Sequence, residues 1–290
     1  MSGRAHRYRV VDVFTDRPLE GNALAVFPDG AGLDPPTMQK IARELNLSET
    51  TFVMPPTRTD CVARVRIFTP GRELPFAGHP TVGTAWVLLD EKAVSGERFA
   101  LEEGVGPVAI RVESGDRPMI WLTTPPIENG RVYERAPCAA ALGLDPDDVL
   151  EVPPQLLSAG NPTLFVGLQN KASVDRAWPD LAGLRALKGQ EPMCVFVFTP
   201  TPEGAYSRMF APEYGIWEDP ATGSATGPLA AFMMRHGLVS GAAGTRFVSE
   251  QGAKMGRKSL LHVEIHGEQG REGIDVGGHV TAVAEAELRL

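Results

Sequence analysis

The chain has 290 residues, of which 43% are hydrophobic, 22% charged and 7% aromatic. This composition is ordinary for a globular protein, it excludes fibrous and disordered chains, and the length allows two domains. Lys and Arg number 28 against 36 Asp and Glu, which gives a net charge of −8, so we expect neither nucleic acid nor an anionic membrane surface as a partner.

The apolar stretches of the sequence are too short to cross a bilayer. The first 14 residues carry basic side chains where a signal peptide needs an apolar core, so we expect a cytoplasmic protein. The three cysteines are widely spaced and have no nearby histidine, which indicates buried thiols rather than disulfides or a zinc site. They are Cys61, Cys138 and Cys194.

An internal repeat divides the chain into two similar halves. The segment Arg-Ile-Phe-Thr-Pro at 66–70 matches Arg-Met-Phe-Ala-Pro at 208–212, and Glu-x-Pro-x-x-Gly at 73–78 matches the same pattern at 218–223. Both offsets are close to half the chain length, as a duplicated unit requires. We therefore expect domains at 1–125 and 126–290, with the final strand near 280–290 a candidate to return to the first domain.

The local patterns predict strands and helices in the same order in each half. Apolar, β-branched runs at 8–14 and 23–27 predict paired strands, and Pro35-Pro36 opens a segment with helical spacing of its apolar residues. The run 81–89 is apolar all round, which predicts a helix buried on every side, and 229–234 repeats it. Further strands are predicted at 50–54, 61–68, 108–112, 119–123 and within 260–290. The pattern predicts an α/β (α+β) fold in which each half is a mixed sheet enclosing a helix.

Two glycine turns precede the buried helices. Gly78-His79-Pro80 and Gly223-Ser224-Ala225 place free backbone N–H groups and the positive end of a helix dipole at these positions. If the halves are related by a pseudo-twofold axis, both helix ends face one site that suits a small carboxylate. His79, Asp219 and Ser224 add side chains that can exchange protons.

Six ordered motifs resemble the phenazine biosynthesis PhzF-like family of isomerases, which shares the diaminopimelate epimerase-like fold. They are Asp12-Val13-Phe14 with Gly21-Asn22, Asn46-Leu47-Ser48-Glu49-Thr50, the segment 77–83 (Ala-Gly-His-Pro-Thr-Val-Gly), the segment 218–225 (Glu-Asp-Pro-Ala-Thr-Gly-Ser-Ala), Gln251-Gly252 and Met255-Gly256-Arg257. The resemblance covers nearly the whole chain. It implies two pseudo-symmetric domains, each a barrel-like sheet around a central helix, a site between them that uses no cofactor, and a homodimer.

The resemblance also implies roles for particular residues. Glu49 matches the family's proton-shuttling carboxylate, with His79 and Asp219 as its catalytic partners, whereas Gly78, Gly223 and Ser224 match groups that bind the substrate. An enclosed, partly dry site would raise the pKa of a glutamate toward neutrality, so that it could act first as base and then as acid. The expected function is isomerisation of a small carboxylate by transfer of one proton.

Several alternatives remain open at this point. Alone, Glu49 is most simply an exposed residue between a helix and a strand, and His79, Asp219 and Ser224 are ordinary turn and capping residues. Ser224, His79 and Asp219 also have the residue types of a serine hydrolase, although the spacing of a nucleophile elbow is missing. A third alternative is a carboxylate-binding protein without turnover.

No metal is expected. His262-x-Glu264-x-His266 shares one face of a predicted strand, but a solvated strand face explains it better than zinc, because no fourth ligand is evident. A two-thiol racemase, as in related epimerases, is disfavoured because the cysteines lie away from both glycine turns.

Overall fold

A computed structural model describes residues 4–188, 193–267 and 273–290, and the chain forms two compact units. Unit 1 comprises Met1–Thr123 with Val276–Leu290, and unit 2 comprises Thr124–Asp275. The predicted domain bounds of 1–125 and 126–290 therefore differ from these units chiefly at residues 276–290, which belong with unit 1.

Unit 1 consists of a mixed sheet and two helices. Its ladder runs in the order β18-β1-β2-β3-β4-β6-β7-β8, with the short β5 paired to β4. The bounds are β1 Ala5–Val13, β2 Asn22–Phe27, α1 Pro35–Leu45, β3 Glu49–Met54, β4 Ala63–Phe68, β5 Glu73–Leu74, α2 Gly78–Asp90, β6 Arg98–Glu103, β7 Gly106–Glu113, β8 Met119–Thr123 and β18 Val280–Arg289.

Unit 2 repeats this plan and adds helices. Its ladder runs β9-β10-β11-β12-β13-β15-β16, with β14 paired to β13. The bounds are β9 Glu128–Val132, α3 Arg135–Ala141, β10 Gln155–Ser158, β11 Thr163–Gly167, α4 Lys171–Arg176, α5 Leu181–Lys188, β12 Cys194–Thr201, β13 Gly204–Ala211, β14 Ile216–Asp219, α6 Gly223–Arg235, β15 Arg246–Gln251 and β16 Ser259–His266. Strand β17, Gly273–Gly278, begins in unit 2 and ends in unit 1.

The two units share one strand topology, which confirms the fold predicted from the repeat. In unit 1, β2 runs parallel to β3 and β4 runs parallel to β6, while β3–β4 and β6–β7 are antiparallel. In unit 2, β11 is parallel to β12 and β13 to β15, while β12–β13 and β15–β16 are antiparallel. The residues of each copy therefore have definable counterparts in the other.

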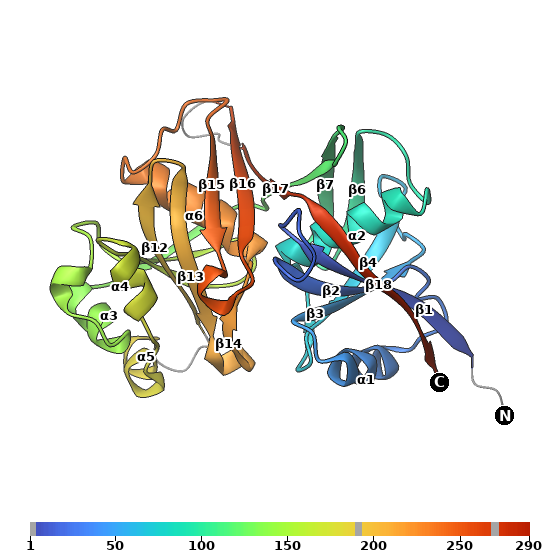
Figure 1. Cartoon of the computed structure of the whole chain (residues 1–290), viewed down its shortest axis with the longest axis horizontal. Coiled ribbons are helices and arrows are strands. Elements are labelled where there is room, and N and C mark those ends of the chain that lie inside the picture. The colour runs from blue at the N-terminus through green and yellow to red at the C-terminus, as the bar shows by residue number, and fades with distance from the viewer. Residues whose placement is uncertain (1–3, 189–192, 268–272) are drawn as a thin grey trace. The chain divides into compact units, whose positions relative to one another are not determined.

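The central helix of each unit is enclosed by strands (Figure 1). In α2, ten of 13 residues are buried, from Gly78 to Leu88. A Cβ atom at Gly83 would lie 2.6 Å from Leu24 Cδ2 and 2.8 Å from Val13 Cγ2, so the helix needs glycine there to approach β1 and β2. Each fully buried Val or Leu side chain contributes about 1.5–3 kcal/mol. The structure thus confirms the predicted buried helix, which begins three residues earlier than its apolar run.

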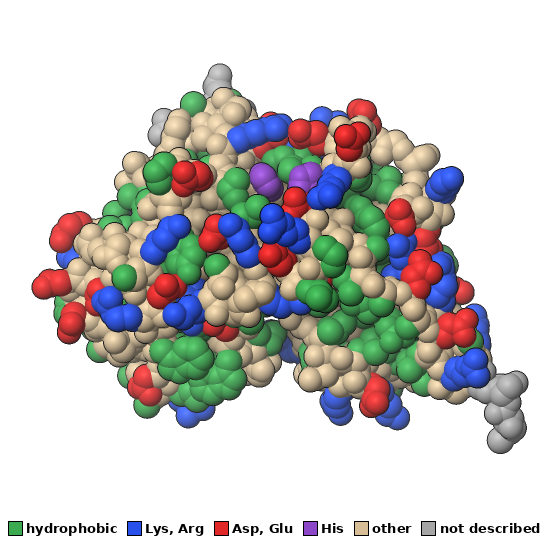
Figure 2. Space-filling model, in the orientation of Figure 1, with side chains coloured by type: hydrophobic (Ala, Val, Ile, Leu, Met, Phe, Trp, Pro, Cys, Tyr) green, Lys and Arg blue, Asp and Glu red, His purple; other side chains and the backbone are tan. Residues whose placement is uncertain are grey.

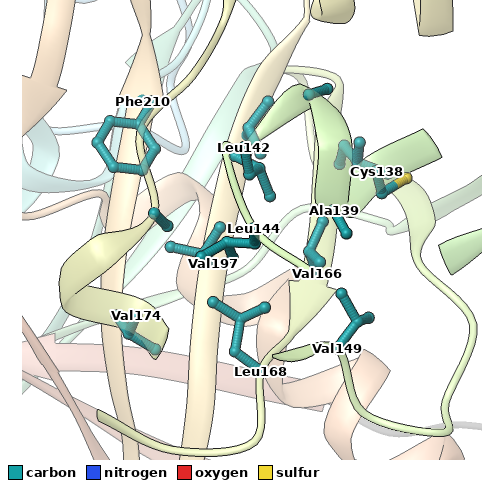
Figure 3. Packing of buried hydrophobic residues seen from close by; sticks show 14 of the residues in the cluster. Cys138, Ala139, Leu142, Leu144, Val149, Val166, Leu168, Val174, Val197 and Phe210 are labelled. Carbon is teal, nitrogen blue, oxygen red and sulfur yellow. The ribbon is translucent and has the colours of Figure 1, made fainter. Parts of the chain in front are cut away.

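A second core lies in unit 2, where helices pack against the face of the sheet opposite to α6. Figure 3 shows Ala139 and Leu142 of the α3 region near strand residues such as Val166 and Val197, and Cys138 belongs to the same buried cluster. Burial raises the pKa of the Cys138 thiol to about 12, so it stays protonated. Cys61 and Cys194 are also buried, which agrees with their expected structural role.

The surface is mixed in charge. On the face shown in Figure 2, acidic and basic side chains are interspersed rather than separated into large fields. Among the described residues, none of the helices is both long and apolar enough to span a membrane.

Two glycines close to β15 allow a test of local packing. Gly252 has φ +73°, and an added Cβ would lie 2.3 Å from the Arg257 carbonyl oxygen and 2.6 Å from that of Pro220, whereas Gly256 has φ +70° and open space around it. We expect Gly256→Ala to cost about 1 kcal/mol, from backbone conformation alone. Gly252→Ala should cost more than about 3 kcal/mol, because two backbone groups must also move. Urea unfolding of both variants measures the difference, and equal losses would contradict it.

Candidate functional site

Glu49 and His79 meet inside unit 1. Glu49 is the first residue of β3, paired with Leu24 of β2, and His79 is the second residue of α2. Glu49 is 8% exposed and His79 3% exposed, and His79 Nε2 lies 3.3 Å from Glu49 Oε2. The isolated interpretation of Glu49 as an exposed residue is therefore wrong, because the strand buries it against the start of the helix.

Asn22 fixes the protonation pattern of the imidazole. The side-chain amide nitrogen of Asn22 lies 3.2 Å from His79 Nδ1 and can only donate, so Nδ1 accepts. Complete burial lowers the pKa of His79 to about 3, so the ring is neutral near pH 7 and carries its proton on Nε2. The atom next to Glu49 is thus an N–H group of a neutral ring.

The start of α2 leaves backbone donors available at this position. The N-cap residue Ala77 has an extended conformation and supplies no side-chain cap. Pro80 has no N–H group, and the Thr81 N–H group and hydroxyl both point to the Ala77 carbonyl oxygen. The N–H groups of Gly78 and His79 precede this first bonded turn and lie at the positive end of the helix dipole.

A second polar cluster, formed by Asp219, Thr222 and Gln251, lies in unit 2. Asp219 ends β14 and is 7% exposed, and the Thr222 hydroxyl donates to its carboxylate. The Gln251 side chain donates to the Asp219 carbonyl oxygen at 2.7 Å and to Thr222 Oγ1 at 3.0 Å, and it accepts from the Thr222 N–H group at 3.1 Å. Gln251 therefore fixes the turn that carries Asp219.

The start of α6 resembles the start of α2. Thr222 is its N-cap residue and makes no side-chain cap bond, Gly223 is buried, and Ser224 is half-buried. The N–H groups of Ala225 and Thr226 both donate to the Thr222 carbonyl oxygen. Gly223 and Ser224 thus occupy the same positions in α6 that Gly78 and His79 occupy in α2.

The structure groups the predicted site residues into two clusters, one in each unit. Gly78, His79 and Glu49 lie together in unit 1, and Asp219, Gly223 and Ser224 lie together in unit 2. The sequence did not assign a role to Asn22, Thr222 or Gln251, although each lies within or beside a motif. The available signal for these three residues was a polar side chain within or beside a motif, because a polar group that becomes buried needs a hydrogen-bond partner.

Two residues of the pattern on β16 contact charged side chains. Glu264 accepts from Arg246 at 3.0 Å, and His266 Nε2 lies 2.9 Å from the carboxylate of Asp275. Within the described ranges, no group of three His, Cys, Asp or Glu side chains is arranged to hold a metal ion.

Comparisons with known proteins point to one family. Residues 11–286 match the family described as phenazine biosynthesis-like protein. A trans-2,3-dihydro-3-hydroxyanthranilate isomerase from Pseudomonas aeruginosa is 39% identical over 288 residues, which cover 98% of this chain and 100% of the relative.

Solved structures agree with the fold. A predicted epimerase from Pseudomonas aeruginosa has a TM-score of 0.83 and 34% identity, and the match covers 98% of this chain and 99% of the other. A PhzF-family phenazine biosynthesis protein from Bacillus anthracis has a TM-score of 0.88 at 24% identity, with 99% and 100% covered.

The Asn22 contact can be tested by NMR. With 15N-labelled histidine, His79 should be neutral and protonated on Nε2 down to about pH 5, since its pKa is lowered to about 3 by burial. Asn22→Asp places a carboxylate opposite Nδ1, so the ring proton should move to Nδ1 and the pKa should rise. An imidazolium signal from wild-type His79 at pH 6 would contradict this assignment.

Proposed function

Because the chain belongs to the phenazine biosynthesis-like protein family and is an isomerase, we propose that Glu49 catalyses its reaction by moving one proton between two carbon atoms of a small carboxylate substrate. The observation that carries this proposal is the buried contact of 3.3 Å between Glu49 and His79 at the uncapped start of α2. A base, a neutral N–H group and free backbone donors are present there together.

The proposed reaction conserves all atoms of the substrate. The Glu49 carboxylate removes a proton from a carbon next to a conjugated system, and the electron pair spreads over that system. The same carboxyl group then returns the proton to a second carbon, so a double bond shifts and Glu49 regains its charge. The Nε2–H group of His79 orients the carboxylate, and a neutral donor does so without holding Glu49 permanently ionised.

The helix starts supply the binding part of the proposal. The backbone N–H groups of Gly78 and Gly223, with the hydroxyl of Ser224, suit a carboxylate because each lies at the positive end of a helix. We propose that the unit 1 cluster (Glu49, Gly78 and His79) and the unit 2 cluster (Asp219, Gly223 and Ser224) act on one substrate. We further propose that Asp219 assists proton transfer. Gln251 and Thr222 then hold Asp219 in place through the three contacts described above.

The Pseudomonas aeruginosa relative indicates which substrate to test first. Its name states that it isomerises trans-2,3-dihydro-3-hydroxyanthranilate, and it is 39% identical to this chain along its whole length. We propose a compound of this class, a carboxylate on an unsaturated ring, as the substrate. The reaction as written uses only side chains and backbone groups, so we propose that it needs no cofactor, and the family similarity supports a homodimer.

Solvent exchange tests the role of Glu49. In D2O, the wild-type protein should incorporate deuterium at carbon into trans-2,3-dihydro-3-hydroxyanthranilate, measured by mass spectrometry. Glu49→Gln should slow this at least about 100-fold, because it removes a general base, while binding persists. Glu44→Gln, at an exposed glutamate on α1, is the matched control and should exchange like wild type.

The same experiment separates the alternatives. Exchange at the wild-type rate in Glu49→Gln would assign the base elsewhere. Binding of the substrate with no exchange in the wild type would favour a carboxylate-binding protein. Covalent labelling of Ser224 by a fluorophosphonate would favour a serine hydrolase instead.

A further inference from the structure

Glu103 is a buried carboxyl group that the proposed reaction does not use. It is the last residue of β6 and 6% exposed. Its Oε1 atom lies 2.6 Å from the hydroxyl oxygen of Thr81, in the first turn of α2. Its Oε2 atom is buried and has no hydrogen-bond partner in the described part of the chain. An ionised carboxylate would be poorly solvated here.

The contacts of the Thr81 hydroxyl bear on the charge state of Glu103. The hydroxyl has one hydrogen, and two oxygen atoms lie within its reach: the Ala77 carbonyl oxygen at 2.8 Å and Glu103 Oε1 at 2.6 Å. A carbonyl oxygen can only accept, so a hydroxyl that donates to Ala77 can bond to Glu103 only as an acceptor. Glu103 can donate only as a carboxylic acid. A protonated Glu103 satisfies both contacts, whereas an ionised one leaves the hydroxyl with two acceptors and one proton.

The internal repeat supplies a neutral counterpart. Arg64 pairs with Glu102 across β4 and β6, and Tyr206 pairs with Glu250 across β13 and β15. The next residues, Glu103 and Gln251, therefore occupy equivalent positions, and each precedes a glycine. A Cβ atom at Gly104 would lie 2.7 Å from Pro75 Cα, and one at Gly252 would lie 2.6 Å from the oxygen of Pro220, the repeat counterpart of Pro75.

Gln251 shows what this position does in unit 2. Its amide donates to the turn just before α6, at the Asp219 carbonyl oxygen and at Thr222 Oγ1. A carboxylic acid, like an amide, is neutral and offers both a donor and an acceptor, although it has one donor hydrogen where the amide has two. Glu103 and Gln251 are thus both able to hold the start of a central helix without adding charge.

The charged groups around Glu103 leave it without a compensating cation. Side chains alternate along a strand, so Leu101 and Glu103 point to the interior and Glu102 to the outer face, where its carboxylate accepts from Thr57 and Arg58. On β4, Arg64 is exposed and Arg66 is half-buried, where it pairs with Glu73 of β5. On α2 the titratable groups are His79, which is neutral, and Asp90 at the far end of the helix, which accepts from Arg9. Burial raises the pKa of Glu103 to about 8, which favours the neutral acid.

We propose that Glu103 is a neutral carboxylic acid that donates its proton to Thr81 and thereby positions the first turn of α2, with His79 on it. Its purpose rests on the proposed function: a neutral group beside the helix start leaves the positive potential there for the carboxylate of the substrate. Glu103 is a positioning residue, since it acts through Thr81 and does not touch the reacting atoms.

Infrared spectroscopy tests the protonation state without reference to activity. At pH 6 the whole protein should show the carbonyl band of a protonated carboxylic acid, and Glu103→Gln should remove it. Thr81→Val should shift the band to higher frequency, because the acceptor of its hydrogen bond is lost. Thr226→Val is the matched control, since Thr226 occupies the position of Thr81 in α6 and bonds to Thr222 in the same way. A band that survives Glu103→Gln would overturn the proposal.

Stability and exchange against pH provide the second readout. The folded-state pKa of Glu103 is above the unfolded value of 4.5, so its contribution is complete below that value and is lost as pH rises through about 8. Glu103→Gln should remove this loss of stability from the pH profile. In the wild type, we expect the rate of deuterium exchange into the substrate to fall above about pH 8, and Glu103→Gln should remove this fall. A fall with pH that is identical in wild type and Glu103→Gln would contradict the proposal, whatever the substrate proves to be.

Discussion

The constraint that shapes this protein is the burial of most of one helix in each unit. A helix wrapped by strands must be apolar on every side. It must also have small residues where a strand crosses it, and Gly83 is such a residue, packed against Leu24 and Val13. The same burial leaves the start of the helix as the place where unbonded N–H groups gather. The requirement for a closed core therefore also produces the helix ends, of α2 and of α6, at which we propose that the substrate carboxylate binds.

Polar groups are then stabilised around these helix starts by specific partners. In unit 1 a neutral imidazole stands between Asn22 and Glu49. In unit 2 Gln251 bonds to both ends of the turn that carries Asp219. Exclusion of water strengthens the hydrogen bonds in both clusters. In unit 1 the same burial lowers the pKa of His79 to about 3.

The sequence predicted the features that depend on local pattern. The repeat and the all-apolar segment 81–89 indicated the fold, and the glycine turns indicated where the helix starts would lie. Burial of Glu49 and its contact with His79 could not be derived from spacing, because they depend on the parallel pairing of β2 with β3. The equivalence of Glu103 with Gln251 was equally hidden, since their sequences differ and only the strand register aligns them.

The C-terminal strand links the ends of the sequence. β18 pairs with β1 along almost its whole length, from Val280 with Val13 to Arg289 with Ala5 (Figure 1). A ribosome must therefore make all of unit 2 before the edge of unit 1 can be covered. Until then the backbone groups of β1 on that side remain open to solvent or to another chain. Unit 2 is one continuous segment, so all of its strands have been synthesised before the last strand of unit 1, although most of unit 1 precedes unit 2 in the sequence.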